Sequence, residues 1–397
     1  MEELAIFGGK PVREKPIYYG HQFVDEKDIA AVVDVLKSDF LTCGPQIPKL
    51  EKKFCEITGA KYAVAVSNGT AALHAACFAA GIGQGDEVIT TPITFAASSN
   101  CVLYCNGTPV FADIKADTYN ISPDEIENKI TGKTKAVIAV DFTGQAAQLK
   151  EIREICRKRN LVFIEDGAHS IGTLYDGKYV GSVADLTTFS FHPVKTVTGG
   201  EGGAVLTNNE DFYQKLLLFR AHGITRNESL MEREPEGDWY YEQIALGYNY
   251  RMTDMQAALI SSQLDKLFIF KQRRKEIVSM YDKAFSDVPE IIVQKEIKES
   301  DTTRHLYIIQ LILERLKGSR KEIFDALKAE NVCCNVHYMP VYYLPYYSRL
   351  GYKKGICPKA EFLYDRMISI PLFYSMTNED VESVICAVKK VIQYYRI

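Results

Sequence analysis

The feature that most constrains the fold of this chain is an alternation between short apolar runs and helical patterns over about residues 25–280. Several runs are apolar on both faces, which is typical of strands that helices cover on each side. Alternation of this kind predicts an α/β domain with a mostly parallel sheet. The seven candidate strands are 62–66, 87–91, 108–112, 135–140, 161–165, 186–191 and 203–206.

The pattern changes after about residue 255, where strands and helices are mixed. We therefore predict a large domain at 1–275, in which about residues 1–24 form an N-terminal arm, and a smaller α+β domain at 276–397. The elements expected in this part are a helix at 257–271, a strand at 306–313, and helices at 321–330 and 380–395.

Charge and composition limit the classes of partner. The 47 basic and 51 acidic residues give a net charge of −4, so there is no basic excess to indicate nucleic-acid binding. No run approaches the roughly 20 apolar residues of a membrane span, and no signal peptide is recognisable. The ten cysteines are scattered without a C-x-x-C pair. We expect a cytoplasmic protein with reduced thiols and no metal site.

A small polar turn, Ser67-Asn68-Gly69-Thr70, lies between the strand expected at 62–66 and an Ala-rich helical pattern. Free N–H groups at the start of a helix attract phosphate, and Thr70 adds a hydroxyl. The same residue types are common in ordinary helix capping, and the P-loop pattern is absent. Alone, the turn supports either interpretation.

Two acids follow the next informative strand, in the run Glu165-Asp166-Gly167-Ala168-His169. Ligands of α/β proteins bind at the carboxyl ends of parallel strands. A carboxylate there can keep a heteroaromatic nitrogen protonated through charge pairing. The alternatives are a helix cap for Asp166 and a core hydrogen bond for His169, and the residues alone leave them open.

The sharpest signal is the run Ser190-Phe191-His192-Pro193-Val194-Lys195, which four glycines follow within positions 199–203. Such a glycine-rich run indicates unusual backbone dihedral angles or a close approach to a ligand. A lysine that this loop holds opposite an acid on a neighbouring strand fits a Schiff-base nucleophile. An arbitrary lysine would be interpreted as a surface residue, but these surroundings favour the chemical role.

A fourth segment, Gly247-Tyr248-Asn249-Tyr250-Arg251, precedes a helix that Thr253 or Asp254 can cap. Its polar and aromatic density exceeds what capping requires and indicates an interface or a ligand. The polar, acidic stretch 225–242 before it contains the only tryptophan, Trp239. That stretch is either a mobile loop over a site or a surface excursion.

Together, the four segments resemble those of the DegT/DnrJ/EryC1/StrS family of sugar aminotransferases, in the same order and over nearly the whole chain. The Ser-Phe-x-x-x-Lys run with its Gly-Glu-Gly-Gly tail is the most specific part. The resemblance implies a pyridoxal 5′-phosphate (PLP) enzyme of fold type I that acts on nucleotide-linked keto sugars. It also implies transamination, because a branch that performs dehydration has histidine in place of Lys195.

The resemblance assigns catalytic roles to three residues. Lys195 is implied to hold PLP and to move protons, and Asp166 is implied to pair with the ring nitrogen of PLP. His169 matches a residue that contacts the ring hydroxyl. Phe95, in the run 91–95, matches the aromatic residue that stacks on the ring.

Four further residues match those that bind the phosphate of the cofactor. Thr70, Ala71 and Ser190 match phosphate-binding positions of the same subunit. Asn249 matches a residue that reaches the phosphate from the partner subunit. The resemblance therefore implies a homodimer with shared active sites.

The C-terminal part resembles the branch that makes UDP-4-amino-4,6-dideoxy-N-acetyl-β-L-altrosamine in pseudaminic acid biosynthesis. The resemblance lies in 336–347 and 369–372, with support from 91–95 and the pair Phe191-His192. Physical chemistry allows the histidine and clustered tyrosines of 336–347 either to contact a sugar or to pack between the domains. The residues predicted to bind substrate are His337, Tyr338, His192 and Arg251.

The expected reaction moves an amino group from L-glutamate to C4 of a UDP-linked 4-keto-6-deoxy-N-acetylhexosamine. The alternatives are another 4- or 3-aminotransferase, acting on a D-configured UDP-4-keto sugar or a dTDP-linked keto sugar, and a non-catalytic PLP-fold binding protein. An NAD-linked sugar epimerase or dehydrogenase lacks support because the G-x-G-x-x-G turn is missing. The candidates for holding the donor carboxylate are Arg220, Arg226 and Arg251.

Overall fold

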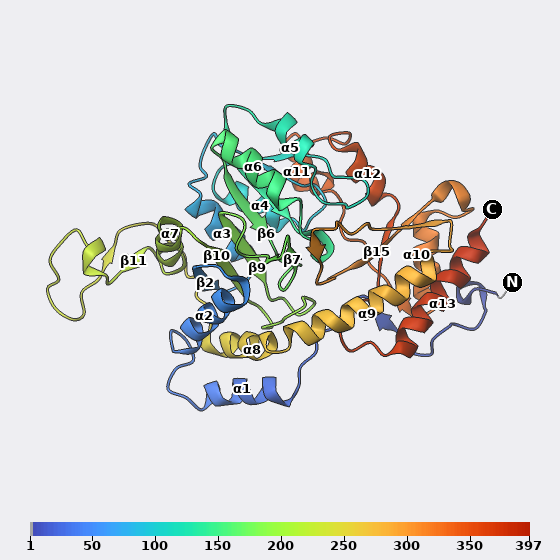
Figure 1. The fold of residues 1–397 in the computed structure, drawn as a ribbon, viewed down its shortest axis with the longest axis horizontal. Helices are drawn as coiled ribbons and strands as arrows, with labels where there is room; N and C mark the ends of the chain where they lie inside the picture. Colours follow the sequence, from blue (N-terminus) through green and yellow to red (C-terminus); the bar gives the residue numbers. More distant parts are fainter. Residues whose placement is uncertain (1–2) are drawn as a thin grey trace.

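A computed structural model describes residues 3–397 (Figure 1). Its centre is a seven-stranded sheet in the order β2-β10-β9-β6-β5-β3-β4, in which only β10 runs antiparallel to its neighbours. All seven predicted strands are confirmed within one residue at each end. The strands are β2 Tyr62–Val66, β3 Glu87–Thr90, β4 Thr108–Phe111, β5 Thr134–Val140, β6 Val162–Asp166, β9 Leu186–Ser190 and β10 Gly203–Thr207.

Helices cover both faces of this sheet, which explains why its strands are apolar on both sides. In β2, Ala63 and Ala65 join one buried cluster, whereas Val64 and Val66 join the cluster on the other face. The first cluster includes residues of α2 Gln46–Thr58, α6 Leu149–Arg159 and α8 Asp254–Leu264. The second includes residues of α3 Gly69–Ala79, α4 Ala97–Tyr104 and α7 Glu210–Arg220.

A second, antiparallel sheet of order β13-β15-β17 belongs to the C-terminal part (Figure 1). It forms a core of its own with α9, α10 and α13. The predicted strand at 306–313 is confirmed in its central part, and the two predicted helices at 321–330 and 380–395 are confirmed. The elements are α9 Leu267–Phe285, β13 Ile291–Val293, β15 Tyr307–Leu311, α10 Arg320–Ala329, α11 Pro345–Arg349, α12 Pro358–Tyr364, β17 Met367–Ile370 and α13 Asn378–Tyr395.

The single helix expected at 257–271 is wrong. Two helices, α8 and α9, meet there, and Asp265 and Lys266 separate them. The amine of Lys266 forms ion pairs with Asp25 at 2.9 Å and with the fully buried Asp28 at 2.6 Å, at the start of α1 Glu26–Leu36. These partners lie more than 200 positions away in the chain, so the local apolar pattern could not reveal the break. The domain division at 275/276 falls within α9 and stays a prediction.

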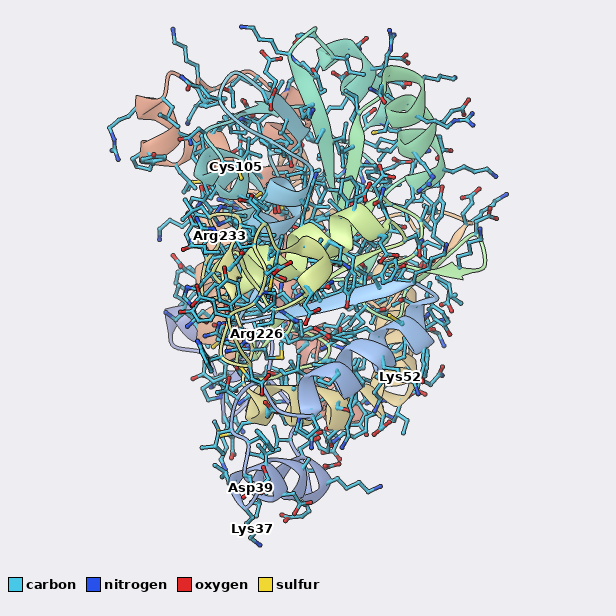
Figure 2. All side chains as sticks on the ribbon, turned by 90° about the vertical axis from the view of Figure 1, so that its left-hand side faces the viewer. Lys37, Asp39, Lys52, Cys105, Arg226 and Arg233 are labelled. Atoms are coloured by element: carbon cyan, nitrogen blue, oxygen red, sulfur yellow. The ribbon has the colours of Figure 1, made fainter. Side chains whose placement is uncertain are left out.

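Short elements complete the fold. The stretch 225–242 lies between the paired strands β11 and β12 and projects from the body at the left of Figure 1. Figure 2 looks at the molecule from this side, where Arg226 and Arg233 are labelled. None of the described helices is long and apolar enough to cross a membrane. The short elements are β1 Ile17–Tyr18, α5 Pro123–Lys129, β7 Leu174–Tyr175, β8 Lys178–Tyr179, β11 Ile224–Thr225, β12 Glu242–Gln243, β14 Ser300–Asp301 and β16 Val332–Cys333.

Candidate active site

A pocket of about 880 Å³ lies where the parallel strands β5, β6 and β9 end, and Val140, Asp166 and Ser190 line it. This volume suits a cofactor together with part of a substrate. The carboxyl edge of the sheet is the position expected for a ligand site in an α/β fold. Ten of the predicted site residues line the pocket: Thr70, Ala71, Phe95, Asp166, His169, Ser190, His192, Lys195, His337 and Tyr338.

Asp166 is 4% exposed, and two hydrogen-bond donors hold its carboxyl group. Ser98 Oγ donates to Oδ2 at 2.7 Å, and the backbone N–H of Ala168 donates to Oδ1 at 3.2 Å. Burial raises the pKa of Asp166, and no Lys, Arg or His side chain of the described residues forms an ion pair with it. A cation placed beside it in the pocket would therefore be strongly favoured.

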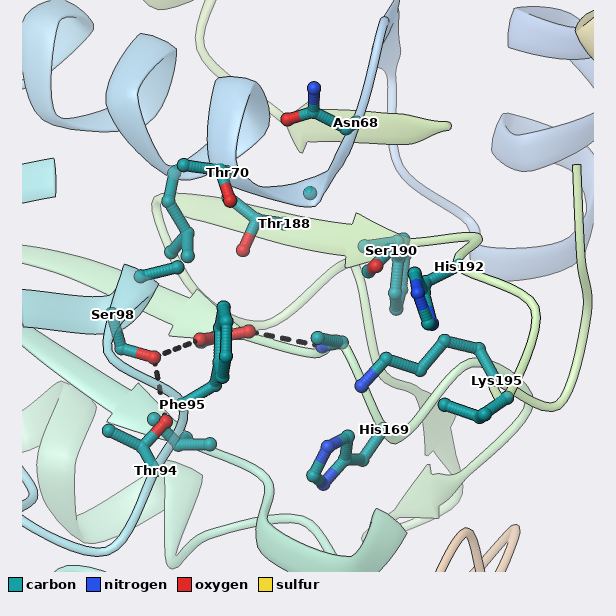
Figure 3. Close-up of a pocket in the computed structure, with 18 of the residues that line it drawn as sticks. Asn68, Thr70, Thr94, Phe95, Ser98, His169, Thr188, Ser190, His192 and Lys195 are labelled. Atoms are coloured by element: carbon teal, nitrogen blue, oxygen red, sulfur yellow. Dashed lines mark hydrogen bonds between the residues drawn. The ribbon is translucent and has the colours of Figure 1, made fainter. Parts of the chain in front are cut away.

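The side chain of Lys195 extends its amine into the space bordered by Phe95, His169 and Ser190 (Figure 3). Burial lowers the pKa of Lys195 to about 8, and the nearby carboxylate of Asp166 opposes this fall. An appreciable fraction of the amine is therefore neutral near pH 8, as a nucleophile or a base requires.

The glycine-rich run after Lys195 packs closely against other parts of the chain. A Cβ on Gly199 or Gly202 would lie 2.6 or 2.7 Å from the side chain of Ile260 in α8, and one on Gly203 would lie 2.3 Å from the carbonyl oxygen of Asn68. Of the four glycines in this run, only Gly200 has a positive φ, +77°. The expected unusual backbone dihedral angle is thus confirmed at Gly200, and the close approaches of the other glycines are to α8 and to the start of α3.

The start of α3 forms a cradle for an anion. The side chain of Asn68 caps the helix by accepting from the N–H of Ala71 at 2.8 Å. A Cβ on Gly69 would lie 2.7 Å from Cβ of Ser190, so only glycine leaves room for the hydroxyl of Ser190 there. Helix N–H groups together with the hydroxyls of Thr70 and Ser190 suit a phosphate.

The ring of Phe95 is 62% exposed although it lines the pocket. An aromatic side chain of this size is normally covered on both faces. The open face of Phe95 is therefore a platform on which a planar ring can stack.

Buried imidazoles lie close to Lys195. The rings of His169 and His305 are 4.4 Å apart, and Nδ1 of each has no hydrogen-bond partner among the described residues. Burial and the charge of Lys195 hold the pKa of both well below the usual range, so both are neutral. Sequence reasoning missed His305, because no motif surrounds it, and it missed Ser98, which lies one helical turn after Thr94.

The tyrosines of 336–347 have different surroundings. Tyr338 lines the pocket, and its hydroxyl lies 3.4 Å from Nε2 of His169. Tyr342 and Tyr347, each 1% exposed, pack against Phe111 instead. Packing is therefore the role of these two tyrosines.

None of the arginines that the sequence suggested is among the described residues that line the pocket. Arg220 forms an ion pair with Glu51 at 2.5 Å, and Arg226 lies on the projecting stretch. Neither Asn249 nor Arg251 is among the described residues that line the pocket. Of those lining residues, Lys195 is the only lysine or arginine.

Comparison with known proteins shows the family of the chain. The model of the DegT/DnrJ/EryC1/StrS aminotransferase family matches residues 22–389. The chain belongs to this family. It is 38% identical to the spore coat polysaccharide biosynthesis protein SpsC of Bacillus subtilis, covering 94% of the chain and 97% of SpsC. It is 37% identical to the UDP-4-amino-4,6-dideoxy-N-acetyl-β-L-altrosamine transaminase of Campylobacter jejuni, covering 93% and 95%.

Solved structures of the family share the fold. The aminotransferase PseC of Helicobacter pylori, involved in the biosynthesis of pseudaminic acid, superposes with a TM-score of 0.89 at 32% identity, covering 96% of this chain and all of PseC. The candidate sugar aminotransferase Spr1654 of Streptococcus pneumoniae in its PLP form superposes with a TM-score of 0.89 at 31% identity, covering 96% of this chain and 99% of Spr1654. The predicted family, fold type I, PLP dependence and aminotransferase class are confirmed.

The residues present fit PLP. The cradle at Gly69 suits the phosphate, Phe95 offers a face to the ring, and Asp166 offers its carboxylate to the ring nitrogen. Nδ1 of His169 is buried beside the same space and has no hydrogen-bond partner among the described residues. The individual roles given to these residues stay predictions.

Proposed function

We propose that this enzyme transfers an amino group from L-glutamate to C4 of a UDP-linked 4-keto-6-deoxy-N-acetylhexosamine. The product is UDP-4-amino-4,6-dideoxy-N-acetyl-β-L-altrosamine. The observation that carries the transfer chemistry is the amine of Lys195, with a pKa of about 8, beside the buried Asp166. The choice of sugar rests on the relative from Campylobacter jejuni.

When bound, PLP supplies an electron sink for a carbanion next to nitrogen. Asp166 keeps the ring nitrogen protonated, because a buried carboxylate without a basic side-chain partner favours a cation next to it. Lys195 Nζ takes the proton from the α-carbon of the donor and later gives a proton to C4 of the acceptor. Phe95 offers its open face to the ring and so orients it for these transfers.

A second candidate substrate is a 4-keto sugar nucleotide of another configuration, because SpsC, a protein of spore coat polysaccharide biosynthesis, is as close in sequence as the altrosamine transaminase. A direct assay separates the two. The purified enzyme with PLP and L-glutamate is offered the L-configured and the D-configured UDP-4-keto-6-deoxy-N-acetylhexosamine, and the amine product is identified by mass and by NMR. Product from the L-configured sugar supports the proposal, whereas product from the D-configured sugar alone overturns it.

We further propose that the active unit is a homodimer with shared sites. The pocket must receive a phosphate, a donor with two carboxylates and a diphosphate, but among its described lining residues Lys195 is the only lysine or arginine, and Asp166 and Glu201 are acidic. One lysine is too few for these anions. A second subunit is a source of the missing cations.

The surface near Asn249 and Arg251 supports this dimer. Leu246 and Tyr248 are 76% and 43% exposed. The neighbouring segment contributes the half-exposed Phe40 and Leu41, and the carbonyl of Leu41 accepts from the backbone N–H at the start of α8. Apolar side chains gathered beside polar ones are typical of an interface.

A further inference from the structure

The N-terminal arm is fastened to the C-terminal part of the fold. The fully buried carboxylate of Glu330 accepts from the backbone N–H groups of Ala5 and Val12, both at 2.9 Å, and forms an ion pair with Lys390 at 3.0 Å. The strand β1 of the arm pairs in parallel with β16, which leads into the wall that holds His337. The arm is thus an ordered part of the structure that reaches the active site.

Two consecutive tyrosines of the arm have opposite surroundings. Tyr18 is 60% exposed. Tyr19 lines the pocket, and its ring lies 4.9 Å from the ring of His337. The backbone of Tyr19 is fixed because its carbonyl accepts from the N–H of Leu372 at 3.1 Å. The hydroxyl of Tyr19 makes no hydrogen bond with another described residue and is available to a ligand.

Tyr19 belongs to a wall of the pocket that has no charged side chain, unlike the side with Asp166 and Lys195. Besides Tyr19, the wall comprises Asn335, Val336, His337 and Tyr338. Burial lowers the pKa of His337 to about 4, so this imidazole is neutral, and the wall has no charged side chain. Neutral aromatic groups with hydroxyl, amide and imidazole functions suit the apolar faces and hydroxyls of a pyranose. They offer no positive charge to pair with the carboxylates of the amino donor.

We infer that Tyr19 is a specificity-determining residue that contacts the sugar ring of the amino acceptor. The inference rests on the proposed function and deepens it by naming a recognition residue outside the predicted site. Because donor and acceptor react in separate halves of the cycle, Tyr19 contributes to the acceptor half and not to the donor half.

The experiment measures each half-reaction alone in full-length, PLP-loaded enzyme. L-glutamate is mixed with one sample, and UDP-4-keto-6-deoxy-N-acetylhexosamine with a sample already loaded with the amino group, while absorbance is followed. In Tyr19→Phe, which keeps the ring, we expect the acceptor kcat/KM to fall about 10-fold, the loss of one hydrogen bond. In Tyr19→Ala, which also removes the ring, we expect the acceptor kcat/KM to fall about 100-fold. The glutamate half should change less than about twofold.

Tyr18→Ala is the matched control, because it removes the neighbouring exposed ring from the same arm, and both half-reactions should stay as in the wild type. An equal loss in both halves for Tyr19→Phe would show a structural role and overturn the inference. An unchanged acceptor half in Tyr19→Ala would overturn it as well. Wild-type enzyme that reacts with glutamate but not with the keto sugar would instead contradict the proposed acceptor itself.

Discussion

At the scale of single residues, the site works by placing few charges in a buried space. Asp166 accepts two hydrogen bonds, yet burial still raises its pKa, and Lys195 is made less basic by the same burial. Each group alone is destabilised in its charged form. A ligand with a ring nitrogen and a carbonyl carbon would remove both costs. Its protonated nitrogen would pair with Asp166, and its carbonyl carbon would react with the neutral amine of Lys195.

The lowered pKa of Lys195 predicts how fast the apoenzyme binds PLP as pH changes. The neutral amine is the form that attacks a carbonyl, so the rate of appearance of the bound-cofactor absorbance should rise with pH and level off above about 8. Because Asp166 raises the pKa of Lys195, Asp166→Asn should move the midpoint to lower pH. A rate that keeps rising towards pH 10 in the wild type would show an unperturbed amine.

Ser98 is expected to be a positioning residue for Asp166. Ser98→Ala removes a 2.7 Å hydrogen bond from Oδ2 and so raises the pKa of Asp166 further. We expect about a 10-fold loss of kcat/KM, and an activity profile whose acidic limb moves to higher pH. Ser98→Thr keeps a hydroxyl and should recover most of the activity. A variant Ser98→Ala with an unshifted profile would mean that the carboxyl does not depend on this donor.

At the scale of elements, the space at the start of α3 depends on the absence of a side chain at Gly69. Gly69→Ala would place a methyl group 2.7 Å from Cβ of Ser190, and such overpacking costs about 1–3 kcal/mol. We expect PLP to bind at least about 10-fold more weakly, as measured by titration of the apoenzyme. Gly83→Ala, beyond the other end of α3 with no atom nearer than 4.0 Å, is the control and should bind normally. Unchanged PLP affinity in Gly69→Ala would show that this turn does not bind the phosphate of the cofactor.

Some helices and strands could be predicted from the sequence, and others could not. The seven strands of the large sheet follow from local apolar runs, because burial on both faces leaves a continuous signal. The break between α8 and α9 does not, since Lys266 meets Asp28 only in the folded chain. Likewise, Lys195 and Asp166 were found through their local motifs, whereas His305 and Tyr19 reach the pocket from segments with no local motif.

At the scale of the whole molecule, the proposed dimer makes a specific prediction about mixed variants. Lys195→Ala and Arg251→Ala should each be inactive alone. If Arg251 acts in the partner's pocket, half of the molecules in an equal, re-equilibrated mixture are heterodimers with one intact site, and activity should return to about a quarter of the wild type. Size-exclusion chromatography and an activity assay of the mixture test this prediction. No recovery would place Arg251 in the pocket of its own chain or outside the site.

The most direct test of the central claim, that Lys195 holds the cofactor of an aminotransferase, is an absorbance spectrum of the purified enzyme before and after L-glutamate. Borohydride reduction and peptide mapping then locate the attached group. We expect a visible band that glutamate shifts and a reduced adduct on Lys195. A colourless protein that binds no added PLP, or an adduct on another lysine, would contradict the account.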